Sequence, residues 1–188
     1  MLAVLLAGGK GTRWAPFTIS LPKPLMPVGN RPILEILIKQ LKDAGVTKVV
    51  ICVGYLESLI RSYFGDGSKF GVEIIYSSET EPLGTAGPMK LIESYLTDSF
   101  FFMNGDLFTD INLEEMFRFH KDNKAVATIG LTRRTVDIDF GVIKIDQTNE
   151  FTEWKEKPTL EYLVSMGIYV FEPAVLKYLP DGYFNVPD

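Results

Sequence analysis

The stretch LAVLLAGGKGTR, residues 2–13, decides the fold. It begins with an uninterrupted apolar run, which is typical of a strand buried on both faces of a sheet. A cluster of glycines follows at once, and Lys10 and Arg13 lie in the same loop. In open α/β sheets, ligands bind beyond the carboxyl ends of the strands, where glycines let backbone N–H groups approach phosphate oxygens. The stretch therefore predicts a buried strand that leads into a phosphate-binding loop.

Apolar runs and helical patterns alternate along the first 120 residues. The runs that predict buried strands are residues 2–7, 48–53, 72–76 and 99–103. Apolar stripes at helical spacing predict helices at residues 32–45, 56–64, 87–96 and 113–120. Because strands and helices alternate, we expect a mostly parallel sheet covered by helices on both faces.

The pattern changes after residue 124, where no long helix separates the apolar runs. The strands expected here are residues 125–131, 141–145, 151–154 and 165–171. Part of the sheet is therefore expected to be mixed or antiparallel. With no repeat and no interdomain linker, the sequence predicts one α/β domain over residues 1–188, a Rossmann-like three-layer sandwich.

Composition and charge narrow the classes of function. The net charge of −5 disfavours a broad nucleic-acid surface, and no apolar run approaches the roughly 20 residues of a membrane helix. Residues 1–7 lack the basic start of a signal peptide, so a buried strand is the better interpretation. The single cysteine, Cys52, lies in an apolar run and is expected to be buried, which fits a reducing cytoplasm. The single histidine, His120, lies in a polar helix end, so we expect it at the surface.

The glycine cluster differs from two common nucleotide motifs. It lacks the P-loop spacing and the third glycine of the dinucleotide fingerprint. Further along, Lys23 stands between Pro22 and Pro24. Prolines fix φ and restrict their neighbours, so this lysine is expected on stiff backbone.

In combination, these segments resemble the sugar-1-phosphate nucleotidylyltransferase family. The family pattern of Gly-x-Gly-Thr-Arg, Pro-x-Thr, Pro-Lys-Pro and Pro-Val is present in order at residues 9–13, 16–18, 22–24 and 27–28. Further segments match the family's base loop, metal-binding step and sugar-phosphate pocket; they are residues 81–87, 104–106, 140–142, 156–158 and 167–169. The resemblance implies the fold of the nucleotide-diphospho-sugar transferases. It also implies attack by a sugar-1-phosphate on the α-phosphorus of a nucleoside triphosphate.

The resemblance also implies a role for particular residues. Arg13, Lys23 and Asp106 would be catalytic, and Asp106 would hold Mg²⁺. The nucleotide would contact Leu6, Ala7, Gly8, Gly9, Gly11, Thr12, Arg13, Glu81, Gly84 and Thr85. The sugar phosphate would contact Asn104, Gly141, Glu156, Lys157 and Gly167.

Two questions stay open at the level of sequence. The resemblance implies a second metal-binding aspartate, which the family usually supplies from an Asp-x-Gly step near the end of the catalytic domain. The sequence stops at residues 184–188 before any such segment, so we expect the chain to lack a C-terminal segment. Residues 81–87 look closest to mannose-1-phosphate guanylyltransferases. The alternatives are a glucose-1-phosphate thymidylyl- or uridylyltransferase and a catalytically silent regulatory subunit. A homo-oligomer is possible.

Overall fold

The computed structural model describes residues 1–79 and 81–186 and divides into two compact units. The main unit comprises Met1–Ile129 and Gly167–Asp188, and the second unit comprises Gly130–Met166. Asp188 lies outside the described residues. The expectation of a single catalytic domain stays a prediction.

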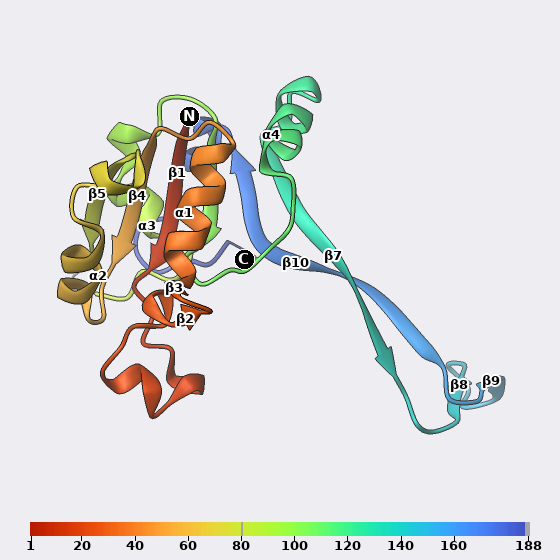
Figure 1. The fold of residues 1–188 in the computed structure, drawn as a ribbon. Coiled ribbons are helices and arrows are strands. Elements are labelled where there is room, and N and C mark those ends of the chain that lie inside the picture. The colour runs from red at the N-terminus through yellow and green to blue at the C-terminus, as the bar shows by residue number, and fades with distance from the viewer. Residues whose placement is uncertain (80, 187–188) are drawn as a thin grey trace. The chain divides into compact units, whose positions relative to one another are not determined.

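A six-stranded sheet organises the main unit (Figure 1). Its strands are β1 (Leu2–Ala7), β4 (Lys48–Val53), β5 (Glu73–Ser78), β6 (Phe100–Asn104), β7 (Ala127–Asp137) and β10 (Thr159–Phe171). Their spatial order is β5-β4-β1-β6-β10-β7. Strands β5, β4, β1 and β6 are parallel neighbours, whereas β10 runs antiparallel to β6. The predicted sheet, mostly parallel and partly mixed, is confirmed.

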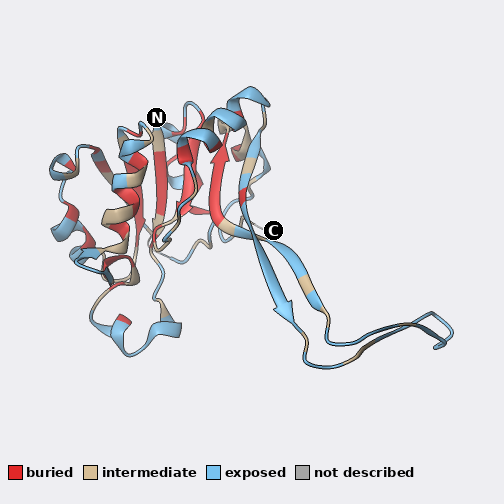
Figure 2. Cartoon of the chain, turned by 45° about the vertical axis from the view of Figure 1, so that its right-hand side comes forward, coloured by how far each residue is buried: buried red, intermediate tan, exposed pale blue. Residues whose placement is uncertain are grey.

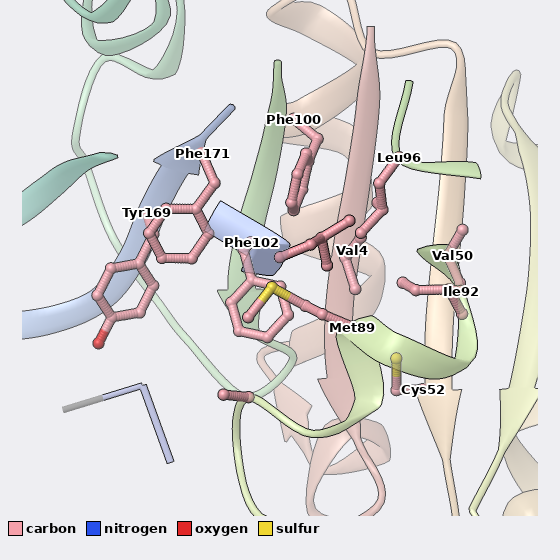
Figure 3. Packing of buried hydrophobic residues seen from close by; sticks show 12 residues of the cluster. Val4, Val50, Cys52, Met89, Ile92, Leu96, Phe100, Phe102, Tyr169 and Phe171 are labelled. Carbon is pink, nitrogen blue, oxygen red and sulfur yellow. The ribbon is translucent and has the colours of Figure 1, made fainter. Parts of the chain in front are cut away.

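One face of the sheet packs against a short helical segment. Side chains alternate between the faces of a strand, and those on this face include Val4 in β1, Cys52 in β4 and Phe102 in β6. Met89 and Ile92 cover them from α3 (Pro88–Leu91) and the residue that follows it (Figure 3). The observed helix α3 is shorter than the helix predicted over residues 87–96, because the backbone angles of Ile92 are not helical. A 3₁₀ turn, Glu93–Tyr95, follows.

The opposite face is covered by α1 (Ile33–Asp43) and α4 (Leu113–Asp122). Figure 1 shows α1 and α3 on opposite sides of β1. In α1 the apolar stripe is fully buried; it comprises Leu34, Leu37, Ile38 and Leu41. From α4, the Phe117 ring lies 5.4 Å from that of Phe101 in β6. The sheet thus has helices on both faces, and the predicted three-layer arrangement is confirmed.

The remaining elements of the main unit are short. Helix α2 (Glu57–Phe64) buries Ile60 and Phe64. The two-residue strands β2 (Pro27–Val28) and β3 (Arg31–Pro32) pair with each other. The 3₁₀ helices are Thr12–Trp14, Phe17–Ile19, Lys23–Leu25, Ser68–Phe70 and Pro173–Tyr178.

The second unit contains the antiparallel strands β8 (Val142–Ile145) and β9 (Phe151–Lys155). In sequence they lie between β7 and β10, and the unit also includes residues 130–137 of β7 and 159–166 of β10. Strands β7 and β10 are both longer than the sequence predicts. Figure 2 shows buried residues concentrated in the main sheet, whereas residues 130–166 are mostly exposed. Trp154 and Phe151, for example, are exposed.

The single cysteine is a core residue, as expected. Cys52 is fully buried, and burial, with the nearby Glu79 carboxylate, raises the pKa of its thiol to about 12. The thiol is therefore protonated and inert near neutral pH. In the described part of the chain, no helix has the length and apolar character needed to cross a membrane.

The expected surface position of His120 is wrong, because this residue is fully buried. Leu113, Met116 and His120 follow one another at helical spacing and form the buried stripe of α4. The imidazole has a partner at each nitrogen. Nδ1 lies 2.9 Å from the Thr128 hydroxyl, and Nε2 lies 3.3 Å from Glu172 Oε1. The polar side chain is buried because both ring nitrogens find partners.

Replacing Glu172 by Gln tests this cluster through the pH dependence of stability. The Ser99 hydroxyl donates to the carboxylate and lowers the pKa of Glu172, and the Lys121 charge acts in the same direction. A carboxyl group whose pKa is lower in the folded state stabilises the fold above its ordinary value of 4.5 and loses this effect as the pH falls through the folded value. We expect E172Q to lose about 1 kcal/mol of unfolding free energy at pH 7.

The measurement is urea unfolding at neutral pH and at about pH 3.5, below which most carboxylates are protonated. The difference between wild type and E172Q should shrink at the lower pH. Glu93→Gln, at an exposed position, is the matched control. A difference that stays constant with pH would contradict the assigned role of the ionised carboxylate.

Candidate active site

A cavity of about 750 Å³ opens at the carboxyl ends of the parallel strands in the main unit. Its walls are formed by the glycine-rich loop after β1, by Lys23 and Pro24, by the ends of β4 and β6, and by the loop after β5. These segments contribute Gly8, Gly9, Lys10, Gly11, Arg13, Trp14, Gly54, Tyr55, Glu79, Glu81, Pro82, Leu83, Gly84, Thr85, Asn104 and Asp106. Tyr183, near the C-terminal end of the described chain, also lines the cavity. This volume suits a ligand of small-molecule size.

The glycine-rich loop is held in place by a buried threonine. The Thr18 hydroxyl donates to the backbone carbonyl of Gly11 at 3.0 Å, and Thr18 itself is almost fully buried. Both residues belong to the segment that the sequence singled out. The hydrogen bond fixes the loop that carries Lys10 and Arg13 on the cavity wall.

Lys23 begins a 3₁₀ turn whose backbone is anchored on both sides. The N–H of Leu25 donates to the Pro22 carbonyl at 2.8 Å, and the N–H of Met26 donates to the Lys23 carbonyl at 3.0 Å. Pro24 and Leu25, the other two residues of this turn, are buried. The lysine therefore projects from stiff backbone, and its ammonium lies 5.6 Å from the centroid of the exposed Trp14 ring.

Asp106 is brought to the same place by the end of β6. The N–H of Gly105 donates to the Leu6 carbonyl at 2.8 Å, so the turn after β6 is bonded to the end of β1. A Cβ at position 105 would lie 2.8 Å from that carbonyl oxygen, and therefore only glycine fits. Beyond this contact, Lys23 Nζ donates to Asp106 Oδ2 at 2.5 Å, with each side chain a little under one-third exposed. A cation and a carboxylate thus face the cavity together.

Glu79, at the end of β5, was not predicted as a site residue. One carboxylate oxygen accepts the N–H of Leu83 at 3.2 Å, and the other lies near Gly8. Burial raises the pKa of Glu79, and the Leu83 N–H acts in the opposite direction. Glu81, Gly84 and their neighbours continue the wall from this point. Two carboxylates therefore stand on the side of the cavity formed by the loop after β5.

Two further cavity residues, Tyr55 and Tyr183, were not predicted from the sequence. Tyr55 lies two residues after the end of β4, so the rule that ligands bind beyond the carboxyl ends of strands could have found it. Glu79 follows β5 in the same way. Tyr183 lies far from the other motifs in sequence, and no local signal marks it.

The structure places the predicted residues in two groups. In the main unit, all the residues predicted to contact the nucleotide line the cavity except Thr12. Of the residues predicted to contact the sugar phosphate, Asn104 lines the cavity and Gly167 in β10 lies against the Asn104 amide. Thr12 instead begins an exposed 3₁₀ turn. In the second unit, Gly141 packs against Trp154, whose Nε1 donates to Glu156 Oε2 at 3.2 Å.

Lys157 also belongs to the second unit and has a left-handed φ of 41°. The sugar-phosphate roles of Gly141, Glu156 and Lys157 stay predictions.

The fit of a divalent cation depends on Asp106. Within residues 1–79 and 81–186, no group of three or more His, Cys, Asp or Glu side chains could hold a metal by itself. Mg²⁺ often binds through one or two carboxylates together with substrate phosphates and waters. A single cavity-facing carboxylate beside cationic side chains fits that kind of site.

Comparisons with known proteins agree with this geometry. Residues 2–185 match the family model described as "Nucleotidyl transferase". A Yarrowia lipolytica protein named mannose-1-phosphate guanyltransferase is 40% identical over 184 residues, which cover 94% of this chain and 50% of the relative. A Synechocystis protein named UTP–glucose-1-phosphate uridylyltransferase is 36% identical over 202 residues, covering 97% of this chain and 52% of the relative.

A solved structure from Bacillus anthracis, whose name gives glucose-1-phosphate thymidylyltransferase as its candidate activity, superposes with a TM-score of 0.75. Its identity is 28%, over 95% of this chain and 74% of that one. This chain spans about half the length of the curated relatives it matches. Since the family model covers nearly every residue, the chain belongs to the nucleotidyl transferase family.

Proposed function

We propose that the protein transfers a nucleotidyl group from a nucleoside triphosphate to a sugar-1-phosphate and releases pyrophosphate. The observation that carries the proposal is the contact of Lys23 with Asp106 beside the glycine-rich loop. A reaction between two phosphates needs cations that offset their repulsion and a carboxylate that can place a metal. Asp106 follows the end of β6, and Lys23 begins a hydrogen-bonded 3₁₀ turn.

The charges in the cavity are compatible with the proposed reaction. A phosphate oxygen of the sugar-1-phosphate attacks the α-phosphorus, a new P–O bond forms, and the bond to the β-phosphate breaks to release pyrophosphate. The nucleophile is already ionised near neutral pH, so no general base is needed. Arg13 and Lys23 would neutralise charge on the reacting phosphates and hold them in line. Asp106 would hold Mg²⁺, which when bound neutralises phosphate charge.

Guanine is the base that we propose on chemical grounds. Its ring N–H and amino group are donors, whereas uracil and thymine present carbonyl oxygens on both sides of one N–H. Glu79 and Glu81, both in the loop after β5, offer carboxylate oxygens that can accept hydrogen bonds from these donors. The likeness to relatives named as guanylyltransferases supports the same choice. We therefore propose GTP, with mannose-1-phosphate or a related manno-configured sugar phosphate as acceptor and the cytoplasm as the location.

The alternative substrates are glucose-1-phosphate with UTP or dTTP. A relative named as a uridylyltransferase favours this reading. A further alternative is a catalytically silent regulatory subunit. Pyrophosphate release with each substrate pair distinguishes the guanylyltransferase, the uridylyl- or thymidylyltransferase and the silent subunit.

The proposal predicts the outcome of a substrate matrix. Full-length protein is mixed with Mg²⁺, each of GTP, UTP, dTTP and ATP, and mannose-1-phosphate or glucose-1-phosphate, and pyrophosphate release is measured. We expect GTP with mannose-1-phosphate to give the highest kcat/KM, by at least about tenfold, or 1.4 kcal/mol. Faster turnover of UTP or dTTP would move the assignment to the glucose-1-phosphate enzymes. Nucleotide binding without pyrophosphate from any pair would establish the silent subunit.

Asp106→Asn tests the metal role. The substitution keeps the size of the side chain and removes the charge that a hard cation needs. We expect kcat to fall at least about tenfold and the Mg²⁺ concentration for half-maximal rate to rise. Asp110→Asn, at an exposed position on the same loop, is the control. An unchanged Mg²⁺ titration curve in a folded D106N protein would remove Asp106 from the metal site.

A further inference from the structure

The segment Tyr183–Val186 is bonded along its backbone to the loop that lines the cavity after β5. The N–H of Phe184 donates to the Leu83 carbonyl at 3.0 Å, and the N–H of Ala86 donates to the Phe184 carbonyl at 2.8 Å. The N–H of Gly87 also reaches the Phe184 carbonyl, at 3.3 Å. Segments about one hundred residues apart thus form one local structure.

Two side chains complete the connection reciprocally. Asn185 Oδ1 accepts the N–H of Thr85 at 3.3 Å, while Thr85 Oγ1 accepts the N–H of Val186 at 2.9 Å. Each residue satisfies a backbone donor of the other segment. The conformation of the loop at Thr85 therefore depends on Asn185.

The approach of the segment leaves no room beside the loop. A Cβ at Gly84 would lie 2.4 Å from the Phe184 carbonyl oxygen, and the φ of Gly84 is +76°. On the inner side, Phe184 and Val186 pack against the buried cluster between α3 and the sheet. The segment is therefore fixed to the core and in turn fixes the loop.

Fixing the segment presents Tyr183 to the cavity. Tyr183 lines the cavity together with Gly84 and Thr85, and it is 65% exposed. A single exposed aromatic ring is ordinary on a protein surface. This ring, however, lies next to residues bonded to the base loop, and aromatic rings are sequence-tolerant stacking surfaces for nucleobases.

We propose that residues 183–186 form a second wall of the nucleobase site. Tyr183 stacks on the base, and Asn185 is a positioning residue that holds the loop at Thr85. The inference rests on the proposed nucleotide substrate and adds a base-binding surface that the sequence motifs do not contain. It also gives a function to the hydrogen bonds that join residues 83–87 to residues 184–186.

The test compares Tyr183→Ala with Tyr183→Phe in the full-length protein. The GTP dissociation constant is measured by calorimetry without sugar phosphate, and KM and kcat are measured with it. We expect Y183A to raise the dissociation constant and KM for GTP at least about fivefold, the lower end of base–aromatic stacking. Because stacking needs only the ring, Y183F should stay within about twofold of wild type. Tyr178→Ala, an exposed tyrosine that does not line the cavity, is the control and should not differ from wild type.

Asn185 is tested by the acceptor it provides. Asn185→Ala removes the oxygen that accepts the Thr85 N–H, whereas Asn185→Asp keeps an oxygen in that place. We expect N185A to raise KM for GTP more than it lowers kcat, and N185D to recover most of the loss. Thermal unfolding followed by circular dichroism separates this effect from general destabilisation.

Wild-type affinity and KM in Y183A would overturn the stacking role, and equal KM values in N185A and wild type would overturn the positioning role. Both outcomes are distinct from failure of the proposed function. If no substrate pair gave pyrophosphate in the wild type, the calorimetric comparison would still decide whether Tyr183 contacts a bound nucleotide.

Discussion

The hydrogen bond from Gly105 to the Leu6 carbonyl ties the ends of the two central strands together. It is possible only because β1 and β6 are parallel neighbours, with Leu6 opposite Asn104 in register. The glycine-rich loop and Asp106 therefore begin at nearly the same point in space. The Lys23 turn, anchored by its own hydrogen bonds, then brings an ammonium against the Asp106 carboxylate. Each catalytic proposal depends on this meeting of strand ends.

The charges that line the cavity bear on how an acidic protein could bind the anionic substrates proposed for it. The net charge is −5, yet Lys10, Arg13 and Lys23 lie together near the glycine-rich loop. Two acidic side chains, Glu79 and Glu81, lie on another part of the cavity wall, the loop after β5. The proposed nucleotide would bring phosphates for the cations and base donors for the carboxylates. Local placement of charge, rather than the total, thus determines which ligand the cavity suits.

The sequence predicted those parts of the molecule that follow from local pattern. Apolar runs such as residues 2–7 and 48–53 identified the central strands, because a strand buried on both faces is apolar at consecutive positions. His120 was misjudged because its polar neighbours in sequence were weighed above its helical spacing from Met116. Tyr183 and Asn185 were missed because their significance comes from bonds to residues about one hundred positions away, which no local pattern records. The roles of Glu156 and Lys157 were predicted from family resemblance alone, and they stay predictions.

The central claim is that Lys23 and Asp106 act as one reaction centre, and a double-mutant cycle tests it most directly. The kcat/KM for pyrophosphate release is measured for wild type, Lys23→Ala, Asp106→Asn and the double variant. Residues in contact within one charged network typically show coupling energies of about 0.5–3 kcal/mol. We predict that each single change lowers kcat/KM strongly and that the double variant is little worse than the worse single variant. If the two losses simply multiplied, or if either single variant kept wild-type activity, the two residues would not form one centre.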